Sequence, residues 1–500
     1  MLNAFIILPI LGAIIIGLLP QTLPASRLKT IAVLIGAVIL SWTIKLAVDF
    51  DLSTAQFQFV EYWDWIPQLG LSYSLGIDGL SFSLLALNSI LTVFAIASTQ
   101  DNIERPRLYY ALILLVNAGI AGAFLAQNLL LFFLFYELEL IPVYLLIAIW
   151  GSEKRSYAAT KFLIYTALSG ILILAGFLGM TWLSGSTSFD YGVIHTKNLT
   201  QIYQLTLLTL LLLGFGIKIP LVPLHTWLPD AYVESSAPVT ILLGGILAKL
   251  GTYGLIRFGL QLFPETWELV APGLSIIAVI SVMYGALTAI AQQDIKRMVA
   301  YSSIGHMGYV IMAIAAGTEI SFIGAISQMV AHGLILAILF QLVGIIEAKV
   351  GTRDLNILNG LMNPVRGLPL VSALLILSGM ASAGIPGLVG FVAEFLVFQG
   401  SFPVFPVQTL LCIIASGLTA VYFVIMLNRT CFGKLHNRLA YYPKVTFSEQ
   451  APALILAALI FFLGVQPSWL LKWTESSAKS MVIALETPSM TDIALDVEQR

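Results

Sequence analysis

The sequence has little charge and almost no cysteine. Only 10% of its 500 residues are Asp, Glu, Lys or Arg, whereas a soluble domain carries about 25%. The two cysteines, Cys412 and Cys431, have no Cys or His cluster near them, so no disulfide framework, iron–sulfur cluster or other metal site is expected. A net charge of −2 without a basic tract argues against a nucleic-acid partner. The sequence also lacks a phosphate loop and a dinucleotide fingerprint, so any driving energy must come from outside this chain.

Long hydrophobic runs take up most of the chain instead. Hydrophobic residues make up 59% of it and the mean hydropathy is +0.94. Runs of roughly 18 or more apolar residues, each long enough to cross a bilayer as a helix, recur about fourteen times. They lie near 1–19, 30–48, 79–98, 109–126, 128–149, 158–183, 204–231, 239–259, 270–290, 297–316, 320–347, 369–399, 405–427 and 451–466. The sequence therefore predicts an all-α polytopic protein of the lipid bilayer, a single membrane domain over residues 1–500, whose first run is a retained span rather than a cleaved signal peptide.

Two of the predicted spans contain breaks. The runs 204–231 and 369–399 are too long for one straight crossing and carry Pro and Gly in their interiors. Backbone groups freed at such breaks are tolerated at membrane depth only inside protein or beside water, so the breaks indicate an ion pathway. The broken spans are the seventh and the twelfth, and a unit of five helices reverses its orientation when it is repeated. We therefore predict two inverted five-helix repeats, spans 4–8 and spans 9–13.

This organisation divides the membrane domain into five parts. They are spans 1–3 with an outer loop (1–98), the first repeat (109–259), the second repeat (270–427), the last span (451–466) and an outer-side tail (467–500). If the spans alternate in direction, most lysines and arginines fall in loops on one side, which is cytoplasmic by the positive-inside rule, and both termini lie on the other side. The segment FQFVEYWDW after the second span alternates like a strand and predicts a small β-hairpin on the outer face. We expect this hairpin to seal the surface or to dock a neighbour.

Five ionisable residues interrupt spans that are otherwise almost purely apolar. They are Glu137, Lys218, Lys249, His332 and Glu394. Each opposes membrane insertion by roughly 2.5 to 3.5 kcal/mol, so a chain that carries several of them is expected to use them. Each of these side chains can bind and release a proton, and we predict that together they form a proton pathway. The alternatives are a satisfied core carboxylate at Glu137, a permanent bridge between it and Lys218, and a helix-capping acid at Glu394.

Further polar residues accompany these five. Glu139 follows Glu137 by two positions, and residues i and i+2 point roughly 200° apart on a helix, so the two carboxylates cannot share one face. We assign Glu137 to the pathway. His225 and Asp230 lie in the tract LHTWLPDAYVESSAP, where they could feed protons to Lys218 or form a structured polar turn.

A second histidine lies in the span before that of His332. His306 is a possible relay, because imidazole titrates near neutral pH. The alternatives are a satisfied core histidine and, with His332, a pair of axial haem ligands.

Three tracts resemble one family of membrane proteins. Residues 216–258, 292–310 and 385–395 are similar to the antiporter-like subunits of respiratory complex I and of multisubunit sodium/proton antiporters, and the resemblance runs over nearly the whole chain. The acid at Glu394, where sister subunits place a lysine, resembles the M-type branch of that family. Residues 135–168 are particularly similar to the M-type subunit of the photosynthetic NDH-1 complex of cyanobacteria and plastids.

The resemblance implies a fold and a site. It implies fourteen spans, inverted repeats and one proton channel built on a Glu137–Lys218 pair, with Lys249 central and Glu394 terminal. It also implies a translocase subunit without a redox centre of its own. Electron transfer from reduced ferredoxin or NAD(P)H to plastoquinone, through iron–sulfur clusters elsewhere in the complex, would drive it.

The resemblance further implies partners and a location. The expected partners are the other membrane-arm subunits, including sister antiporter-like subunits. The expected location is the cyanobacterial thylakoid membrane, with basic loops cytoplasmic and both termini lumenal, and a plastid thylakoid or a bacterial plasma membrane is the alternative. Two other functions stay open: a subunit of a multisubunit cation/proton antiporter, and a structural membrane subunit without its own channel.

Overall fold

The computed structural model describes residues 1–435 and 442–486 and is built almost entirely from helices. Twelve helical stretches in this part of the chain are long and apolar enough to cross a membrane. They are α2 (Ala25–Asp49), α3 (Gly79–Ala97), α4 (Pro106–Leu125), α5 with α6 (Leu129–Leu138 and Leu140–Trp150), α7 (Arg155–Leu183), α8 (Gln201–Lys218), the stretch from α10 to η5 (Ala237–Leu260), α12 (Pro264–Ile290), α13 (Ile295–Ala316), α14 (Glu319–Val350), α17 (Pro406–Cys431) and α18 (Phe447–Val465). Together with α1 (Ala4–Leu18) and the pair α15 (Pro369–Ser382) and α16 (Val389–Ser401), they account for the predicted fourteen crossings.

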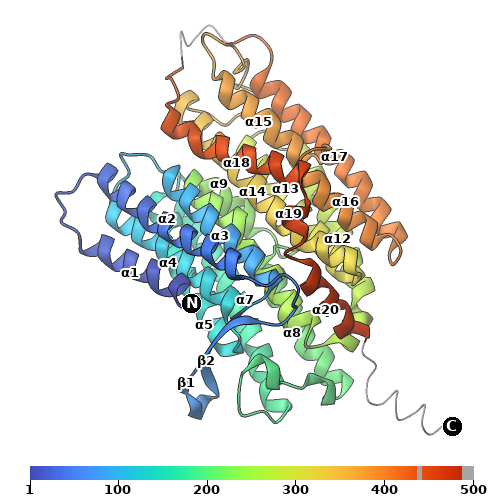
Figure 1. Ribbon diagram of the computed structural model, residues 1–500. Coiled ribbons are helices and arrows are strands. Elements are labelled where there is room, and N and C mark those ends of the chain that lie inside the picture. The colour runs from blue at the N-terminus through green and yellow to red at the C-terminus, as the bar shows by residue number, and fades with distance from the viewer. Residues whose placement is uncertain (436–441, 487–500) are drawn as a thin grey trace, which may run out of the picture.

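Helix α14 lies at the centre of this arrangement. In Figure 1 the N-terminal helices, blue to green, gather on one side and the C-terminal helices, yellow to red, on the other, with α14 between them. Helix α14 packs against α3 and α10 (Ala237–Leu242) of the first group and against α13, α15, α16 and α18 of the second. Almost every residue from Ser321 to Val343 on this helix is buried. Any polar side chain in its middle turns is therefore enclosed by protein.

The two predicted helix breaks are confirmed. Helix α8 ends at Lys218 because Pro220 has no N–H and its ring clashes with the preceding turn. The chain continues through an irregular segment into the short helix α9 (Trp227–Glu234), and the Trp227 indole N–H donates to the carbonyl of Ile217 at 2.8 Å. This bond satisfies one of the carbonyl groups that the end of a helix leaves unpaired.

The second break separates α15 from α16. Gly384 and Gly387 between them have φ of +69° and +91°, a left-handed conformation that glycine adopts without steric cost. A Cβ on Gly384 would also lie 2.8 Å from Oε2 of Glu394, so only glycine leaves room for that carboxylate. The break thus shapes the surroundings of one predicted pathway residue.

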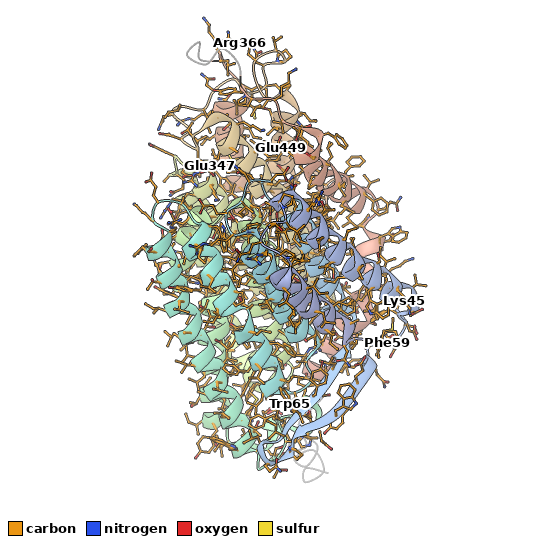
Figure 2. The ribbon with its side chains drawn as sticks, turned by 90° about the vertical axis from the view of Figure 1, so that its left-hand side faces the viewer. Lys45, Phe59, Trp65, Glu347, Arg366 and Glu449 are labelled. Atoms are coloured by element: carbon orange, nitrogen blue, oxygen red, sulfur yellow. The ribbon has the colours of Figure 1, made fainter. Side chains whose placement is uncertain are left out.

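The predicted β-hairpin is also present. Strand β1 (Gln58–Ile66) pairs antiparallel with β2 (Leu71–Ile77), with Ile66 opposite Leu71 across a turn that ends at Gly70. Figure 2 shows Arg366, Glu347 and Glu449 near one end of the molecule and Lys45, Phe59 and Trp65 in the opposite half. The hairpin and the basic loop at Arg366 therefore lie toward opposite ends, as the distribution of charge predicts.

The hairpin is fixed to the rest of the chain by polar contacts. The Glu61 carboxylate accepts hydrogen bonds from the Leu2 N–H at 2.7 Å and from the Asn3 side chain. The Tyr73 hydroxyl donates to Asn3, and burial together with the nearby Glu61 charge raises the pKa of Tyr73 to about 12. Tyr73 therefore stays a neutral donor at physiological pH and keeps its hydrogen bond to Asn3, the residue before α1.

A buried ion pair joins the hairpin, α3 and the end of the eighth span. Asp78 follows β2 directly and caps α3, and its Oδ2 accepts from Arg257 Nη2 at 2.7 Å. The two side chains are only 6% and 4% exposed. The guanidinium also lies 4.9 Å from the centre of the Phe57 ring and 5.4 Å from that of Tyr253. Asp78 was not singled out from the sequence, because its partner is 179 positions away.

Asp78→Asn is expected to lower the free energy of unfolding by about 3–5 kcal/mol, because the Arg257 charge then stays buried without a counter-charge. The thermal denaturation of the purified protein in detergent measures this loss. The matched control is Glu319→Gln, which removes an exposed ion pair with Lys479 at 3.9 Å. Exposed pairs contribute roughly 0–1 kcal/mol, so an equal loss in both variants would contradict a specific role for the buried pair.

Candidate proton-transfer site

The first buried cluster is an ion pair between Lys218 and Glu139. The Lys218 ammonium donates to Oε1 of Glu139, and the two side chains are 1% and 0% exposed. Lys218 also lies 4.7 Å from the ring centre of Tyr136. The second carboxylate oxygen, Oε2, has no hydrogen-bond partner among the described residues. This oxygen is available to bind a proton.

This pairing corrects the expected Glu137–Lys218 pair. Glu137 is only partly buried, and its carboxylate packs on α7 at Gly170, where a Cβ would come within 2.1 Å of Oε1. Lys218 and Glu139 both lie close enough to act electrostatically on Glu137. In the structure Glu139 faces Lys218 and Glu137 faces a neighbouring helix, and the assignment of Glu137 to the pathway stays a prediction.

Pro142 interrupts the helix that carries the two glutamates. A proline inside a helix removes one i→i−4 hydrogen bond and clashes with the carbonyl four residues earlier, which here belongs to Leu138. The structure accordingly ends α5 at Leu138 and begins α6 at Leu140, with Glu139 at the junction. Glu137 and Glu139 nevertheless face different helices, as their i, i+2 spacing predicts. The signal for the interruption was present in the sequence ELELIP.

The second cluster joins Lys249 to His332. Lys249 is fully buried on α11 (Ala248–Gly254), and its Nζ lies 2.8 Å from Nδ1 of His332 and 2.6 Å from the carbonyl oxygen of Gly244. Within the described residues no carboxylate lies within ion-pair distance of Lys249. Its partners are a carbonyl and an imidazole, so Lys249 can exchange a proton directly with His332.

The helix that carries Lys249 is irregular on both sides of it. The π-helical segments η4 (Leu243–Leu247) and η5 (Leu255–Leu260) flank α11. Single π turns inside α-helices are frequent at functional sites, because they release backbone groups from the regular ladder. The Gly244 carbonyl that receives the lysine belongs to η4. The glycines in LLGGILAK were visible in the sequence, but the π turns were not predicted.

The third cluster joins His306 to Glu394. Nδ1 of His306 on α13 lies 3.4 Å from Oε1 of Glu394 on α16, and both side chains are 5% exposed. The other oxygen, Oε2, accepts from the Ser416 hydroxyl at 2.8 Å. Nε2 of His306 lies 3.0 Å from Oγ of Ser382, the last residue of α15. Glu394 therefore lies within α16 and contacts other helices, and it is not a helix cap.

The second and third clusters meet at the two histidines. The rings of His306 and His332 lie 5.4 Å apart between centres, at 40° to each other. The structure thus brings Lys249, His332, His306 and Glu394 into one continuous row across four helices. The Lys218–Glu139 pair adjoins this row through packing of α8 on α11, where Gly251 contacts the backbone of Phe215 and Ile219.

The paired histidines do not fit haem ligation. Axial imidazoles approach the iron from opposite faces of a macrocycle. Here the two rings contact each other directly, Nδ1 of His332 faces Lys249, and Nε2 of His306 faces Ser382. The rings and their helices leave no space for a planar group between them.

His225 and Asp230 lie apart from these clusters. Asp230 forms ion pairs with Lys161 at 2.8 Å and with Arg297 at 3.3 Å, so it links α9 to α7 and α13. The His225 ring packs edge-on against the Tyr284 ring, with 4.7 Å between the ring centres. Nδ1 of His225 has no hydrogen-bond partner among the described residues. No hydrogen bond or ion pair joins either residue to Lys218 in the described ranges. The geometry of Asp230 matches the structured polar turn that was the alternative.

Together these features define a class of protein. Helices broken at membrane depth carry buried lysine, histidine and glutamate side chains that contact one another, as in membrane proteins that move ions.

Comparison with known proteins identifies the family. Residues 126–419 match the family described as "NADH:quinone oxidoreductase/Mrp antiporter, TM". A protein of Synechococcus sp. (strain JA-3-3Ab) named NAD(P)H-quinone oxidoreductase chain 4 1 is 39% identical over 98% of this chain and 94% of its own length. A chain 4 1 protein of Thermosynechococcus vestitus is 38% identical over 100% of this chain and 96% of its own.

Solved structures share the fold. A chain of respiratory complex I from Thermus thermophilus with bound NADH superposes with a TM-score of 0.88 and 26% identity, covering 97% of this chain and all of the other. A chain of the Mrp complex from Dietzia sp. DQ12-45-1b has a TM-score of 0.84 at 22% identity over 97% of this chain and 99% of its own, which shows the fold alone. The chain therefore belongs to the NADH:quinone oxidoreductase/Mrp antiporter family of transmembrane subunits.

Proposed function

We propose that this chain is a proton-translocating subunit in the membrane arm of an NDH-1-type NAD(P)H-quinone oxidoreductase. The contact row from Lys249 through His332 and His306 to Glu394 carries the proposal, because each member can bind and release a proton. The names of the relatives support the redox complex over a stand-alone cation/proton antiporter. Electron transfer takes place in other subunits of that complex and supplies the energy.

The row assigns a role to each side chain. Protonated Lys249 passes a proton to Nδ1 of His332, to which it already points. As Nδ1 of His332 takes up this proton, Nε2 of His332, which has no hydrogen-bond partner among the described residues, releases one toward Nδ1 of His306, whose ring centre lies 5.4 Å away. His306 then passes a proton from Nδ1 to Oε1 of Glu394. Glu394 releases it beside the break between α15 and α16, where freed backbone groups can hold water.

The Lys218–Glu139 pair acts on this row by its charge. Two unit charges ~10 Å apart at an effective dielectric of ~20 interact by roughly 1.7 kcal/mol. An energy of this size moves the pH at which a neighbouring group titrates by about one pH unit. Opening the pair would expose the Lys218 charge to Lys249, and Glu137 offers a second carboxylate for Lys218. A change at the first cluster would thereby favour proton release at the second.

The same proposal covers location and organisation. We place the basic loops on the cytoplasmic side and both termini on the lumenal side of a thylakoid membrane, with sister antiporter-like subunits as neighbours. Spans 4–8 and 9–13 are the inverted repeats, and the broken elements α8–α9 and α15–α16 occupy matching places in them. Cross-linking of this chain to neighbouring subunits in native membranes tests the partners.

Glu394→Gln tests the proposed function. The amide keeps the size of the side chain but cannot accept a proton, so the assembled complex should keep its electron transfer while the number of protons moved per electron falls. Both quantities are measured in sealed membrane vesicles containing the whole complex. Glu319→Gln at the exposed start of α14 is the control and should behave as wild type. Full proton movement by Glu394→Gln would contradict the proposal.

A further inference from the structure

The row contains one buried amide that the proposed pathway does not use. Gln328 lies on α14 one helical turn before His332, and it is 2% exposed. Its Nε2 lies 3.3 Å from Nδ1 of His306, and its Oε1 has no hydrogen-bond partner among the described residues. An unpaired amide oxygen in a buried position has an energetic cost, so its retention beside a titratable ring calls for an explanation.

Two groups approach the same nitrogen of His306. Besides the Gln328 amide, Oε1 of Glu394 lies 3.4 Å from Nδ1. The other ring nitrogen, Nε2, faces Ser382 and can donate to its hydroxyl oxygen throughout. Two aromatic rings in the described part of the chain also neighbour this ring, His332 and Tyr309, with ring centres 5.4 Å and 5.6 Å from that of His306. Tyr422 of α17 donates to Ser302 of α13 and lies close enough to act electrostatically on Glu394. The position of the proton at Nδ1 is therefore decided between Gln328 and Glu394.

The two ends of the amide fit two different protonation states. When Glu394 carries the proton, Nδ1 is a bare acceptor and the amide NH₂ donates to it. When the proton sits on Nδ1, the ring is an imidazolium and the amide oxygen accepts from it. The nitrogen and oxygen of an amide are nearly equal in size, so a half-turn of the side chain exchanges them without displacing neighbours.

We propose that Gln328 is a positioning residue that turns with each proton passed between His306 and Glu394. In the transfer, the N–H bond at Nδ1 breaks and an O–H bond forms at Oε1 of Glu394, with no change in oxidation state. The amide then rotates so that it donates to the bare nitrogen and stabilises the new state. This proposal rests on the proposed function. It adds a side chain that stabilises the proton either on His306 or on Glu394, according to which way the amide is turned.

Two substitutions should move the pH profile of proton movement in opposite directions. Gln328→Met removes the acceptor that stabilises the imidazolium, and hydrogen bonds to charged groups are about twice as strong as neutral ones, so the profile should shift to lower pH. Gln328→Glu places an acceptor-only carboxylate there and should shift it to higher pH. Each shift should be about half to one pH unit, the effect of one hydrogen bond at the ring.

The chain provides a matched control on the same helix. Gln341 is also 2% exposed and also has an unpaired Oε1, but its Nε2 donates to the backbone carbonyl of Glu449 at 3.1 Å. Gln341→Met shows how far the loss of any buried amide on this helix affects the protein. It should leave the pH profile of proton movement unshifted.

The measurement is the number of protons moved per electron by the whole complex in sealed vesicles, as a function of pH. Opposite shifts at Gln328 with an unshifted Gln341→Met support the proposal. Shifts in the same direction, or none, overturn it. If Gln328→Met does not assemble, Gln328→Glu decides alone: a shift to higher pH supports the proposal and any other result overturns it. Failure of the proposed function itself would show separately, as full proton movement by Glu394→Gln.

Discussion

Replacing the buried ion pair by an uncharged pair, in a Lys218→Met/Glu139→Gln double variant, is expected to leave assembly intact and to lower this subunit's proton translocation about tenfold. A buried ion pair adds little net stability, and uncharged groups of similar volume often replace it without loss. Removing one partner alone costs about 3–5 kcal/mol, because the other charge stays buried and unpaired. Lys218→Met alone should therefore reduce the amount of assembled complex, and the added Glu139→Gln should restore it.

This design separates stability from transport. Native gel electrophoresis measures assembly, and proton movement is measured in vesicles made from the same membranes. The control is a second buried pair outside the row, replaced in an Arg257→Met/Asp78→Asn double variant, which should assemble and still move protons. If the Lys218→Met/Glu139→Gln double variant moves protons as well as wild type, the first cluster has only a structural role.

At Lys249, an arginine should be as damaging as a methionine. Arginine keeps the positive charge but does not lose its proton in a protein, whereas the proposed step requires Lys249 to give a proton to His332. Both variants should keep electron transfer and lose this subunit's share of proton movement. The readouts are quinone reduction and the acidification or alkalinisation of the vesicle interior.

The two Lys249 variants also distinguish charge from proton exchange. A pathway that needs only a fixed positive charge at the centre would tolerate Lys249→Arg and fail with Lys249→Met. That result would contradict the assignment of Lys249 as a proton carrier. A larger side chain also fills more space, so assembly of both variants is checked by native gel electrophoresis before transport is compared.

The features predicted from the sequence are those that depend on local patterns. Hydropathy gave the spans, and the prolines and glycines near Pro220 and Gly384 gave the two breaks, because both effects act within a few residues. Alternation of aromatic and polar residues gave the hairpin for the same reason. Charge inside apolar runs identified Lys218, Lys249, His332 and Glu394, all of which lie in the contact clusters.

The features that were missed depend on contacts between distant segments. The Glu139–Lys218 pair joins residues 79 positions apart, so the local sequence does not show which of the two glutamates meets Lys218. His306 and Glu394 meet only because α13 packs on α16. Small polar groups such as Ser382, Ser416 and Gln328 are common in helices, and nothing in their local pattern marks them as neighbours of a titratable side chain.

The roles of the residues in the row stay predictions, and so does that of Glu137. Its carboxylate lies on α7 rather than on Lys218, which leaves it as a second acceptor. Glu137→Gln should reduce proton movement less than the Lys218→Met/Glu139→Gln double variant does, if Glu139 is the carboxylate that holds Lys218.

The central claim is that protons cross this subunit through its buried, contacting titratable side chains. The most direct test is the number of protons moved per electron by the whole complex, compared between wild type and Lys249→Arg in the same vesicles and at the same rate of quinone reduction. We expect the Lys249→Arg complex to move fewer protons per electron than wild type, and the difference should equal the contribution of one channel. An unchanged ratio in a fully assembled Lys249→Arg complex would contradict it.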